Sequence, residues 1–406
     1  MDLLTAALRM PSCVDGVPRV KQVLAALKAM PQDRLDLALE ALQAHLDISP
    51  EDELAWTMRT RLLSQCGNTA EAAATVETMI VRFAGTELDS LIDEIADQLP
   101  ENVRLLASRV LPMAASGSEH LGFLLHDLEV AGVSRKAVTK IALCSQAGAE
   151  FAFYSSIPAL SPELTQVIPE IFGLFRTRNQ RCVCITMEWI EGRPIQLESM
   201  SDDEIVQLLR LRQPLDRIQP STLLEAFQPQ ELKLILGQKR MAPLLGLGHL
   251  PGNLQIFGDW LGGIVANRDY PQGLATEIRH TLQRIAASGL SDGLIPARHY
   301  RLNHGDFYHN NILTAGLNQY RFIDWSSAVT SVRGADLALL LRRLPYERIL
   351  SLLESADITR DFDGIDWAFF HYALIAASIM IDIPQIIHED PDKLFIPALQ
   401  ALTRAL

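Results

Sequence analysis

The sequence lacks a hydrophobic run long enough to cross a bilayer comfortably. Its longest apolar stretch, WAFFHYALIAASIMIDI, runs from Trp367 to Ile383, contains His371, and ends at Asp382 and Pro384. A buried helix explains this stretch better than the alternative of a membrane span. The first residues, MDLLTAALRMPSCVDG, show no basic start followed by a long apolar core, so we expect no signal peptide.

An excess of positive charge is also missing. The chain has 36 Lys and Arg residues against 49 Asp and Glu residues, which gives a formal net charge of −13. This balance argues against charge-driven binding to nucleic acid or to an anionic membrane surface. We therefore expect neither a nucleic acid nor a membrane as a partner.

Cysteine is scarce, and its five positions fit no disulfide framework. Cys182 and Cys184 alternate around Val183 in a predicted strand, so both should face the same side. No second group of Cys or His lies near them in the sequence, as a zinc site would need. Buried thiols in a reducing cytoplasm are the preferred interpretation, and a metal site is the alternative. The localisation predicted is cytoplasmic.

The composition that is present predicts a folded chain throughout. Hydrophobic residues make up 48% and charged residues 21% of the 406 residues, a length that suits two or three domains. Residues 19 to about 100 carry apolar residues at helical spacing with Gly, Asn and Pro breaks, which predicts helices.

A repeat register is visible in this helical segment. Ala38 and Ala72 are 34 residues apart, the length of a tetratricopeptide repeat. Pro50, Trp56 and Gly67 then fall where the closing proline, the tryptophan and the turn glycine of that repeat belong. The segment resembles one tetratricopeptide repeat preceded by half of another. A plain helical bundle with accidental spacing is the alternative.

From about Leu105 the pattern changes to short apolar runs separated by turns, and then to mostly helical spacing. We assign no structure to residues 237–272. The predicted strands are 104–114, 121–130, 137–143, 170–175 and 181–190, and the predicted helices are 147–160, 201–213, 274–288, 334–344 and 366–381. The predicted domains are 1–100 (helical), 101–193 (nucleotide-binding) and 194–406 (helical, with the catalytic loop and acceptor site).

The stretch LNHGDFYHNNIL, residues 302–313, concentrates groups that phosphoryl transfer needs. Asp306 and Asn311 are five residues apart, and Asp324 follows 18 residues after Asp306 at the end of the apolar run YRFI. One carboxylate must orient an acceptor hydroxyl and take its proton, while an amide oxygen and a second carboxylate hold Mg²⁺. NNILTA and YRFID, joined by GLNQ, predict a hairpin that would bring the three together. An Asx-rich turn without function is the alternative for the loop.

These residues carry a family resemblance. HGDFYHNNIL followed by FIDWSSA resembles the catalytic loop and metal-binding segment of the aminoglycoside phosphotransferase and choline kinase families, and GADLALLL fits the segment that follows. The resemblance covers roughly residues 105–406. It implies that Asp306 is the catalytic base, that Asn311 and Asp324 bind Mg²⁺, and that Asp336 supports the loop.

The resemblance also implies an α+β fold class. These families share the two-lobed protein-kinase-like fold, with a small β-rich N-lobe and a large helical C-lobe, here preceded by an all-α segment. His304 is expected to support the loop by hydrogen bonding rather than to carry protons. The metal segment is Asp324-Trp325-Ser326, and few residues separate it from the next predicted helix. Both features disfavour a protein kinase, whose activation segment needs more room.

A nucleotide lobe of this kind needs a Lys on its third strand that meets the nucleotide phosphates and pairs with a Glu on the next helix. Lys140 in AVTKIAL and Glu150 in AGAEFAFYSSI fill these positions. Lys136 is a rival, but we place it in a turn. A surface Lys and an unrelated surface Glu are the alternative.

Two further parts of the nucleotide site follow from the resemblance. The turn ASGSEH would cover the phosphates, and the backbone of ITMEWIEGRPI would bond the adenine. ATP is the expected donor, with GTP also possible. The residues assigned to these two parts are Ser116, Gly117, Ser118, Glu188, Trp189 and Ile190.

The sequence thus predicts an ATP- and Mg²⁺-dependent phosphotransferase acting on a hydroxyl of a small molecule, such as an amino sugar, aminoglycoside, amino alcohol or sugar. Acidic residues would suit a cationic or polyhydroxylated acceptor, and the candidates in the C-terminal part are Asp363, Asp366, Asp382 and Glu389. The alternative is a kinase-like binding protein with vestigial catalysis, which recruits a protein partner through its N-terminal helices.

Overall fold

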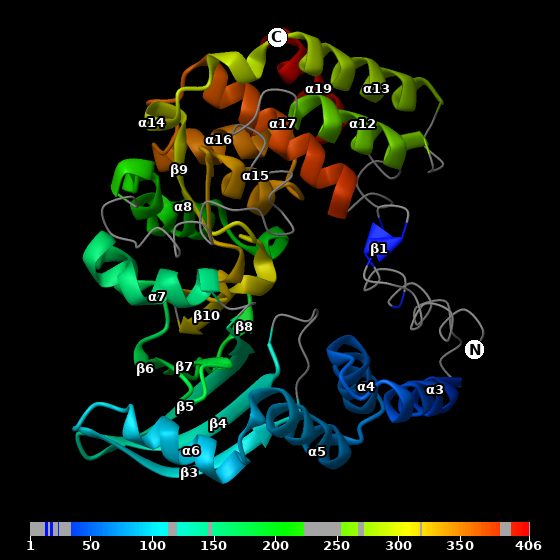
Figure 1. Ribbon diagram of the computed structural model, residues 1–406. Helices are drawn as coiled ribbons and strands as arrows, with labels where there is room; N and C mark the ends of the chain where they lie inside the picture. Colours follow the sequence, from blue (N-terminus) through cyan, green and yellow to red (C-terminus); the bar gives the residue numbers. More distant parts are fainter. Residues whose placement is uncertain are drawn as a thin grey trace. The chain divides into compact units, whose positions relative to one another are not determined.

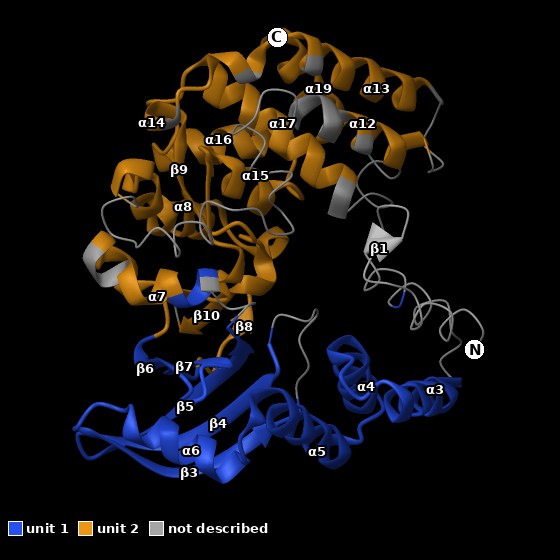
Figure 2. Cartoon of the chain, viewed as in Figure 1, with its two compact units in different colours: residues 1–151, 170–189 blue, residues 152–169, 190–406 orange. Residues whose placement is uncertain are grey.

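The computed structural model forms two compact units (Figures 1 and 2). The first unit comprises residues 1–151 and 170–189, and the second comprises residues 152–169 and 190–406. The residues that the structure describes are 13–14, 17–18, 23, 34–112, 120–144, 148–222, 253–266, 272–316, 319–381 and 391–405.

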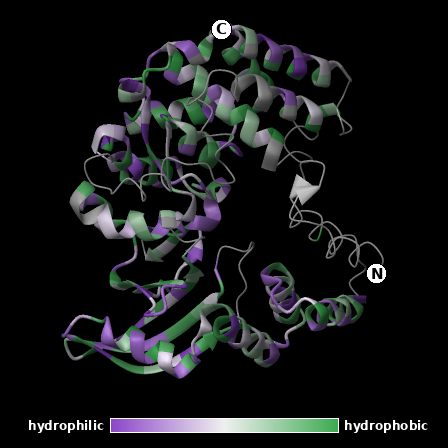
Figure 3. Ribbon diagram, in the orientation of Figure 1, coloured by the Kyte–Doolittle hydropathy of each residue, from purple (hydrophilic) through white to green (hydrophobic). Residues whose placement is uncertain are grey.

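The first unit contains an antiparallel five-stranded sheet in the order β3-β4-β5-β7-β6. Hydrophobic and hydrophilic residues are interspersed along its strands (Figure 3). The β4–β5 hairpin turns at Ala131 and Gly132, which both have positive φ, as a two-residue turn between twisted strands requires. The five predicted strands are confirmed. Their bounds are β3 Val103–Leu111, β4 Gly122–Val130, β5 Val133–Leu143, β6 Ile171–Arg176 and β7 Cys182–Glu188.

One expectation about this sheet is wrong. Lys136 lies within β5, opposite Asp127 of β4, and not in the turn. The turn occupies only two residues, so the strand begins at Val133, earlier than its apolar run suggests. Exposed polar residues at the start of β5 hid that part of the strand from an apolar-run argument.

Helices over residues 35–97 precede the sheet, within the segment from 19 to about 100 that was predicted to be helical, and the last of them pack on it. The apolar core there joins Val76, Ile80 and Ile95 of the helices to Leu124 and Ile141 of the sheet. These helices therefore shield one face of the sheet from water. Their bounds are α3 Leu35–Ile48, α4 Glu53–Gln65, α5 Thr69–Met79, the π-helical segment η2 Ile80–Gly85 and α6 Leu88–Asp97, and before them a short hairpin pairs β1 Cys13–Val14 with β2 Val17–Pro18.

The residues of the proposed repeat register take ordinary helical positions. Ala38 and Ala72 are fully buried, and Gly67 has φ +78° in the turn between α4 and α5. A helical bundle would show the same features. The tetratricopeptide assignment, and the domain boundaries predicted at residues 100 and 193, stay predictions.

Cys182 and Cys184 are both buried on β7 and both pack in the core beneath the helices, which confirms that they face the same side. Burial raises the pKa of the Cys182 thiol to about 12 and raises that of Cys184 further. Both are free thiols. Among the described residues, neither belongs to a group of side chains that could hold a metal.

The second unit is mostly helical and also contains short strand pairs. The predicted helices 201–213, 274–288, 334–344 and 366–381 correspond to α8, α13, α15 and α17. The helix bounds are α7 Gly148–Leu160 (begun in the first unit), α8 Asp202–Arg212, α12 Asn253–Ala266, α13 Gln272–Ala287, α14 Pro296–His299, α15 Ala335–Leu341, α16 Tyr346–Ala356, α17 Gly364–Ile381 and α19 Phe395–Ala405. The 3₁₀ turns are η3 Pro162–Gln166, η4 Leu197–Ser199, η5 Gln213–Arg217, η7 Leu290–Gly293, η8 His309–Asn311 and η9 Trp325–Ser327.

The strands of this unit form two small sheets. β8 pairs with β10, β10 pairs with β11, and β9 pairs with β12. The predicted hairpin after the catalytic loop is therefore confirmed as β10–β11. The strand bounds are β8 Arg193–Pro194, β9 Tyr300–Asn303, β10 Ile312–Gly316, β11 Gln319–Phe322 and β12 Val329–Val332.

Residues 367–381 of the longest apolar stretch lie in α17, and the side chains of residues 368–379 are buried, including Phe369, Phe370 and Leu374. This confirms the buried helix. In the part of the chain that the structure describes, no helix combines the length and the apolar character needed to cross a membrane.

Candidate active site

The loop between β9 and β10 depends on a glycine. Gly305 has φ +81°, and a Cβ atom there would lie 1.9 Å from the carbonyl oxygen of Ser327. Both the left-handed conformation and this close approach exclude any other residue without rearrangement. Gly305 therefore brings the backbone before Asp306 against the segment that follows Asp324.

Asp336, in the first turn of α15, fixes the backbone of this loop. Its carboxylate is fully buried and accepts the backbone N–H of His304 at 2.7 Å and that of Gly305 at 3.0 Å. Two such bonds hold both residues that precede Asp306. The prediction that Asp336 supports the loop is confirmed.

Arg212, which the sequence analysis missed, completes this support. Its guanidinium is fully buried, bonds both carboxylate oxygens of Asp216 at 2.9 and 2.8 Å, and lies 3.5 Å from Asp336. It also donates to Oδ1 of Asn303 at 3.3 Å. Burial has the largest single effect on its pKa and lowers it, but the two carboxylates outweigh burial and raise the pKa overall. The charge of Asp336 is thus compensated inside the protein.

His304 is fixed in one tautomer. Its Nε2 donates to the carbonyl of Ile323 at 2.9 Å, and its Nδ1 accepts the backbone N–H of Asp306 at 3.4 Å. Burial lowers the pKa of this imidazole, so it stays neutral. The geometry is that of a supporting hydrogen-bond bridge, as expected from the sequence.

Asp306 and Asn311 contact each other directly. The amide nitrogen of Asn311 donates to the Asp306 carboxylate at 3.0 Å and to the Asp306 carbonyl at 2.8 Å. These bonds orient the carboxylate. Because they use the amide nitrogen, the amide oxygen is the atom of Asn311 that could bind a hard cation.

Asp324 is tied to the same loop through its neighbour. The backbone N–H of Ile323 donates to the Asn311 carbonyl at 3.0 Å, and the Ile323 carbonyl accepts from His304. Asp324 itself adopts φ 62° and ψ 65°, a left-handed conformation that costs a non-glycine residue on the order of 1 kcal/mol or more. Strain of this kind persists where the surrounding structure imposes it and is often found at functional sites.

Two aromatic residues, Trp325 and Tyr308, lie near Asp324 and give further information on its position. Trp325 is fully buried and stacks on Phe153 at 3.7 Å between ring centroids, which anchors the residue after Asp324. The pKa of Tyr308 is raised first by burial and then by the carboxylates of Asp306 and Asp324. Both carboxylates therefore lie within electrostatic range of one phenol. The Asp324 carboxylate and the amide oxygen of Asn311 are hard oxygen donors, which suit Mg²⁺.

In the first unit, Lys140 and Glu150 form a buried ion pair of 2.7 Å, with side chains 7% and 2% exposed. Side chains alternate along a strand, so Lys140 of β5 lies on the sheet face opposite Ile141, which packs under the N-terminal helices. The alternative of two unrelated surface residues is thus wrong. The role of this pair toward a nucleotide stays a prediction.

In the linker predicted to bond adenine, two of the three backbone N–H groups already form hydrogen bonds within the protein. The backbone N–H of Glu188 donates to the Glu170 carbonyl at 2.8 Å, and that of Trp189 donates to the Lys136 carbonyl at 3.1 Å. Within the described residues, Ile190 is the residue of the three whose N–H has no such bond. Ser116, Gly117 and Ser118, predicted to cover the phosphates, lie outside the described residues.

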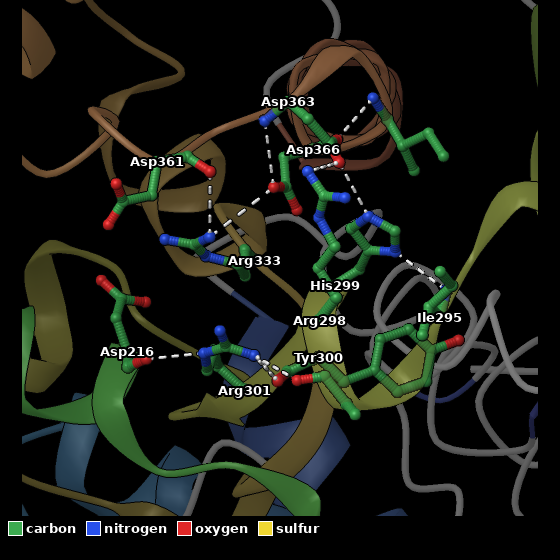
Figure 4. A network of polar contacts seen from close by, with 12 residues as sticks. Asp216, Ile295, Arg298, His299, Tyr300, Arg301, Arg333, Asp361, Asp363 and Asp366 are labelled. Carbon is green, nitrogen blue, oxygen red and sulfur yellow. Dashed lines mark hydrogen bonds and ion pairs between the residues drawn. The ribbon is translucent and has the colours of Figure 1, made fainter.

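Two of the acidic residues predicted to suit the acceptor, Asp363 and Asp366, already have charged partners in the structure (Figure 4). Asp363 accepts from Nε2 of His299 at 3.0 Å and pairs with Arg298 at 2.8 Å. Asp366, only 1% exposed, lies 3.7 Å from Arg333. Their charges are compensated by neighbouring side chains. Two further candidates, Asp382 and Glu389, lie outside the described residues.

The same network does not suit a metal, although His299, Asp363 and Asp366 are close enough to share one. Nδ1 of His299 accepts the backbone N–H of Ile295 at 2.8 Å, so its Nε2 carries the proton that Asp363 accepts. No imidazole lone pair remains for a cation. The cluster is a structural hydrogen-bond network.

Comparison with known proteins gives the family. The sequence model of the phosphotransferase enzyme family (APH) matches residues 116–370, more than half of the chain. The chain belongs to this phosphotransferase family. The matched region contains Lys140, Glu150, Asp306, Asn311 and Asp324, and it begins after the N-terminal helices. No curated protein sequence matches the chain significantly.

Solved structures with some likeness to this chain include phosphotransferases and kinases. The AMP complex of spectinomycin phosphotransferase APH(9)-Ia has a TM-score of 0.43 and 13% identity, covering 78% of this chain and 94% of that one. Choline kinase LicA from Streptococcus pneumoniae has a TM-score of 0.40 and 12% identity, with 78% and 97% covered. Plasmodium vivax ethanolamine kinase has a TM-score of 0.42 and 11% identity, with 98% and 96% covered. The family assignment rests on the sequence match.

Proposed function

We propose that this member of the family is an ATP- and Mg²⁺-dependent phosphotransferase that acts on a hydroxyl group of a small molecule and has the two-lobed protein-kinase-like fold. The observation that carries the proposal is the geometry of the catalytic loop. There the Asp306 carboxylate is oriented by Asn311, and the segment before Asp324 is hydrogen-bonded to that same loop.

In the proposed reaction, the Asp306 carboxylate accepts a hydrogen bond from the acceptor hydroxyl and takes its proton as the oxygen attacks the terminal phosphorus. The new O–P bond forms while the bond to the ADP oxygen breaks. The amide oxygen of Asn311 and the carboxylate of Asp324 would hold Mg²⁺. Bound there, the ion supplies charge neutralisation for the phosphates.

Lys140 is proposed to bind the donor phosphates, with Glu150 holding its ammonium in place. Their ion pair of 2.7 Å is buried, so the ammonium is held before a nucleotide arrives. ATP is the proposed donor, and GTP would satisfy the same phosphate contacts. The adenine contact is proposed at the backbone around Ile190.

A small-molecule acceptor is favoured over a protein. The residues between Asp324 and α15 form only the turn η9 and the strand β12. Such a short, ordered connection leaves no extended activation segment to hold a peptide. The acceptor classes proposed from the family resemblance are sugars, amino sugars, aminoglycosides and amino alcohols.

Thermal shift measurements with ATP and GTP, each with and without Mg²⁺, test this proposal. We expect nucleotide to raise the melting temperature of the wild type only with Mg²⁺, and the shift to disappear in Asp324→Asn. Asp203→Asn, an exposed carboxylate on α8, is the control and should keep the shift. If no nucleotide stabilises the wild type, the proposal fails, and a vestigial kinase-like binding protein becomes the better interpretation.

A further inference from the structure

A pocket of about 820 Å³ adjoins the catalytic loop and lies wholly within the second unit. Part of its wall comes from the segment after β8 and the start of α8. Another part comes from His309 and Asn310, the two residues immediately before Asn311. No local pattern in the sequence marks this pocket, because its wall joins segments more than 100 residues apart.

The charged residues on the wall are not equally available to a ligand. Glu198 lies 3.7 Å from Arg343, so these two charges compensate each other. Glu204 accepts both the backbone N–H and the hydroxyl of Ser201 at 2.8 Å in the capping box of α8, where the helix N-terminus also offsets its charge. Arg193, in contrast, forms no ion pair with any residue that the structure describes.

The remaining polar groups of the wall suit hydroxyl groups. Gln196 and Asn310 offer amides, which can both donate and accept, and the Ser199 hydroxyl, which donates to the Gln196 carbonyl at 2.8 Å, can accept. The volume falls in the range of pockets that bind small ligands. Asn310 also hydrogen-bonds the hydroxyl of Tyr308, the phenol within electrostatic range of Asp306. The wall therefore leads toward the proposed base.

We propose that this pocket binds a polyhydroxylated small molecule that carries an anionic group, either a carboxylate or a phosphate ester, and that Arg193 binds the anion. The inference rests on the proposed function in taking this molecule to be the acceptor. It departs from a cationic acceptor, because the carboxylates on the wall are compensated and Asp363 and Asp366 are engaged elsewhere.

Calorimetric titration of the full chain with four matched sugars tests the binding claim: glucose, glucosamine, glucuronate and glucose 6-phosphate. We expect at least one anionic sugar to bind tenfold or more tightly than glucose and glucosamine. A preference for glucuronate or for the phosphate ester identifies which anion is used. Tightest binding of glucosamine, or no measurable binding of either anionic sugar, would overturn the proposal.

Matched arginine variants locate the site. Arg193→Gln should weaken binding of the anionic sugar at least tenfold. Arg360→Gln, a 76% exposed arginine outside the pocket wall, should leave it unchanged. Ser199→Trp, which fills the pocket from an exposed position, should also abolish binding. Equal effects of the two arginine variants would contradict the assignment.

Release of ADP from Mg²⁺-ATP in the presence of the bound sugar separates this proposal from the proposed function. Sugar-stimulated release that is lost in Asp306→Asn and needs tenfold more sugar in Arg193→Gln supports both. Stimulated release by a neutral or amino sugar, unaffected by Arg193→Gln, keeps the phosphotransferase and overturns the anionic acceptor. If the anionic sugar binds through Arg193 but stimulates no hydrolysis or transfer from any nucleotide, the pocket is an anion-binding site and is not the acceptor site.

Discussion

Each unit contains a buried cation paired with a carboxylate: Lys140 in the first unit and Arg212 in the second. The two cations differ in the number and kind of groups that contact them. Arg212 is committed to three protein partners, Asp216, Asn303 and Asp336, which together hold the loop before the proposed base. Lys140 of β5 pairs with Glu150 of α7 at 2.7 Å. The planar guanidinium suits a fixed structural junction, whereas a compact ammonium suits phosphate binding. The charge of Arg212 therefore stabilises the structure of the site, whereas we propose that the charge of Lys140 takes part in the reaction.

The largest effect should come from deleting residues 1–100, which removes the helices beside the Lys140 strand. The sheet face that carries Leu124 and Ile141 would lose its cover of apolar helix residues. Exposure of so large an apolar surface favours aggregation over folding. We expect an insoluble fragment in an expression and sedimentation assay. A soluble fragment that still binds nucleotide would show instead that the helices form a separate domain.

Replacing Arg212, the buried cation that supports the loop, should cause the next largest loss of stability. Arg212→Met leaves Asp216 and Asp336 without their buried partner, so we expect about 3–5 kcal/mol less free energy of unfolding in urea denaturation. Arg360→Met, at an exposed pair, is the control and should change stability by less than about 1 kcal/mol. A small effect of Arg212→Met would contradict its role as the junction of the loop.

For the Lys140–Glu150 pair, we expect removal of both charges together to cost less stability than removal of the Lys140 charge alone. Lys140→Met alone removes the cationic partner of the buried Glu150 carboxylate, and should cost roughly 3 kcal/mol. Adding Glu150→Leu should restore most of the unfolding free energy, since an apolar pair of similar volume is tolerated in such a site. The double variant should nevertheless show no nucleotide-dependent thermal shift. A stable double variant that keeps the shift would exclude Lys140 from phosphate binding.

The smallest effect at neutral pH concerns a buried histidine in the same sheet, whose contribution to stability is lost only in acid. His126 contacts Ser108 at 2.7 Å and Thr139 at 2.8 Å, and burial lowers its pKa to about 4. The unfolded chain binds the proton below its ordinary pKa near 6.5. Stability should therefore be full above pH 6.5 and fall by up to about 3 kcal/mol toward pH 4.

His126→Gln isolates this contribution, because glutamine can hydrogen-bond and does not titrate. Urea denaturation between pH 7 and pH 4 should show a shallower loss of stability for the variant than for the wild type. Parallel profiles for the two proteins would mean that other groups dominate this pH range.

The parts of the site that the sequence predicted are those whose spacing is short. Asp306 and Asn311 are separated by five residues and contact each other, and Lys140 and Glu150 lie on neighbouring elements. Arg212 was missed because its bond to Asn303 spans 91 residues, and nothing local marks it as buried. Tertiary contacts of this length leave no periodic signal in a sequence.

The fold was likewise predicted where the local sequence carries a clear signal and missed where it does not. Strands and helices with a clear apolar period were predicted, including the hairpin β10–β11 and the buried helix α17. The helix α12 was not, because Gly262 and Gly263 in its interior weaken the helical signal. Polar residues at the start of β5 concealed that strand's true beginning, which is why Lys136 was placed in a turn.

The measurement that tests the central claim most directly is the dissociation constant of Mg²⁺-ATP, determined by calorimetry for the wild type, Asp306→Asn and Asp324→Asn. If Asp306 is the base and Asp324 a metal ligand, Asp306→Asn should bind within about threefold of the wild type, while Asp324→Asn should bind at least tenfold more weakly, about 1.4 kcal/mol. Equal affinities for all three proteins, or equal losses in both variants, would contradict the division of roles on which the account rests.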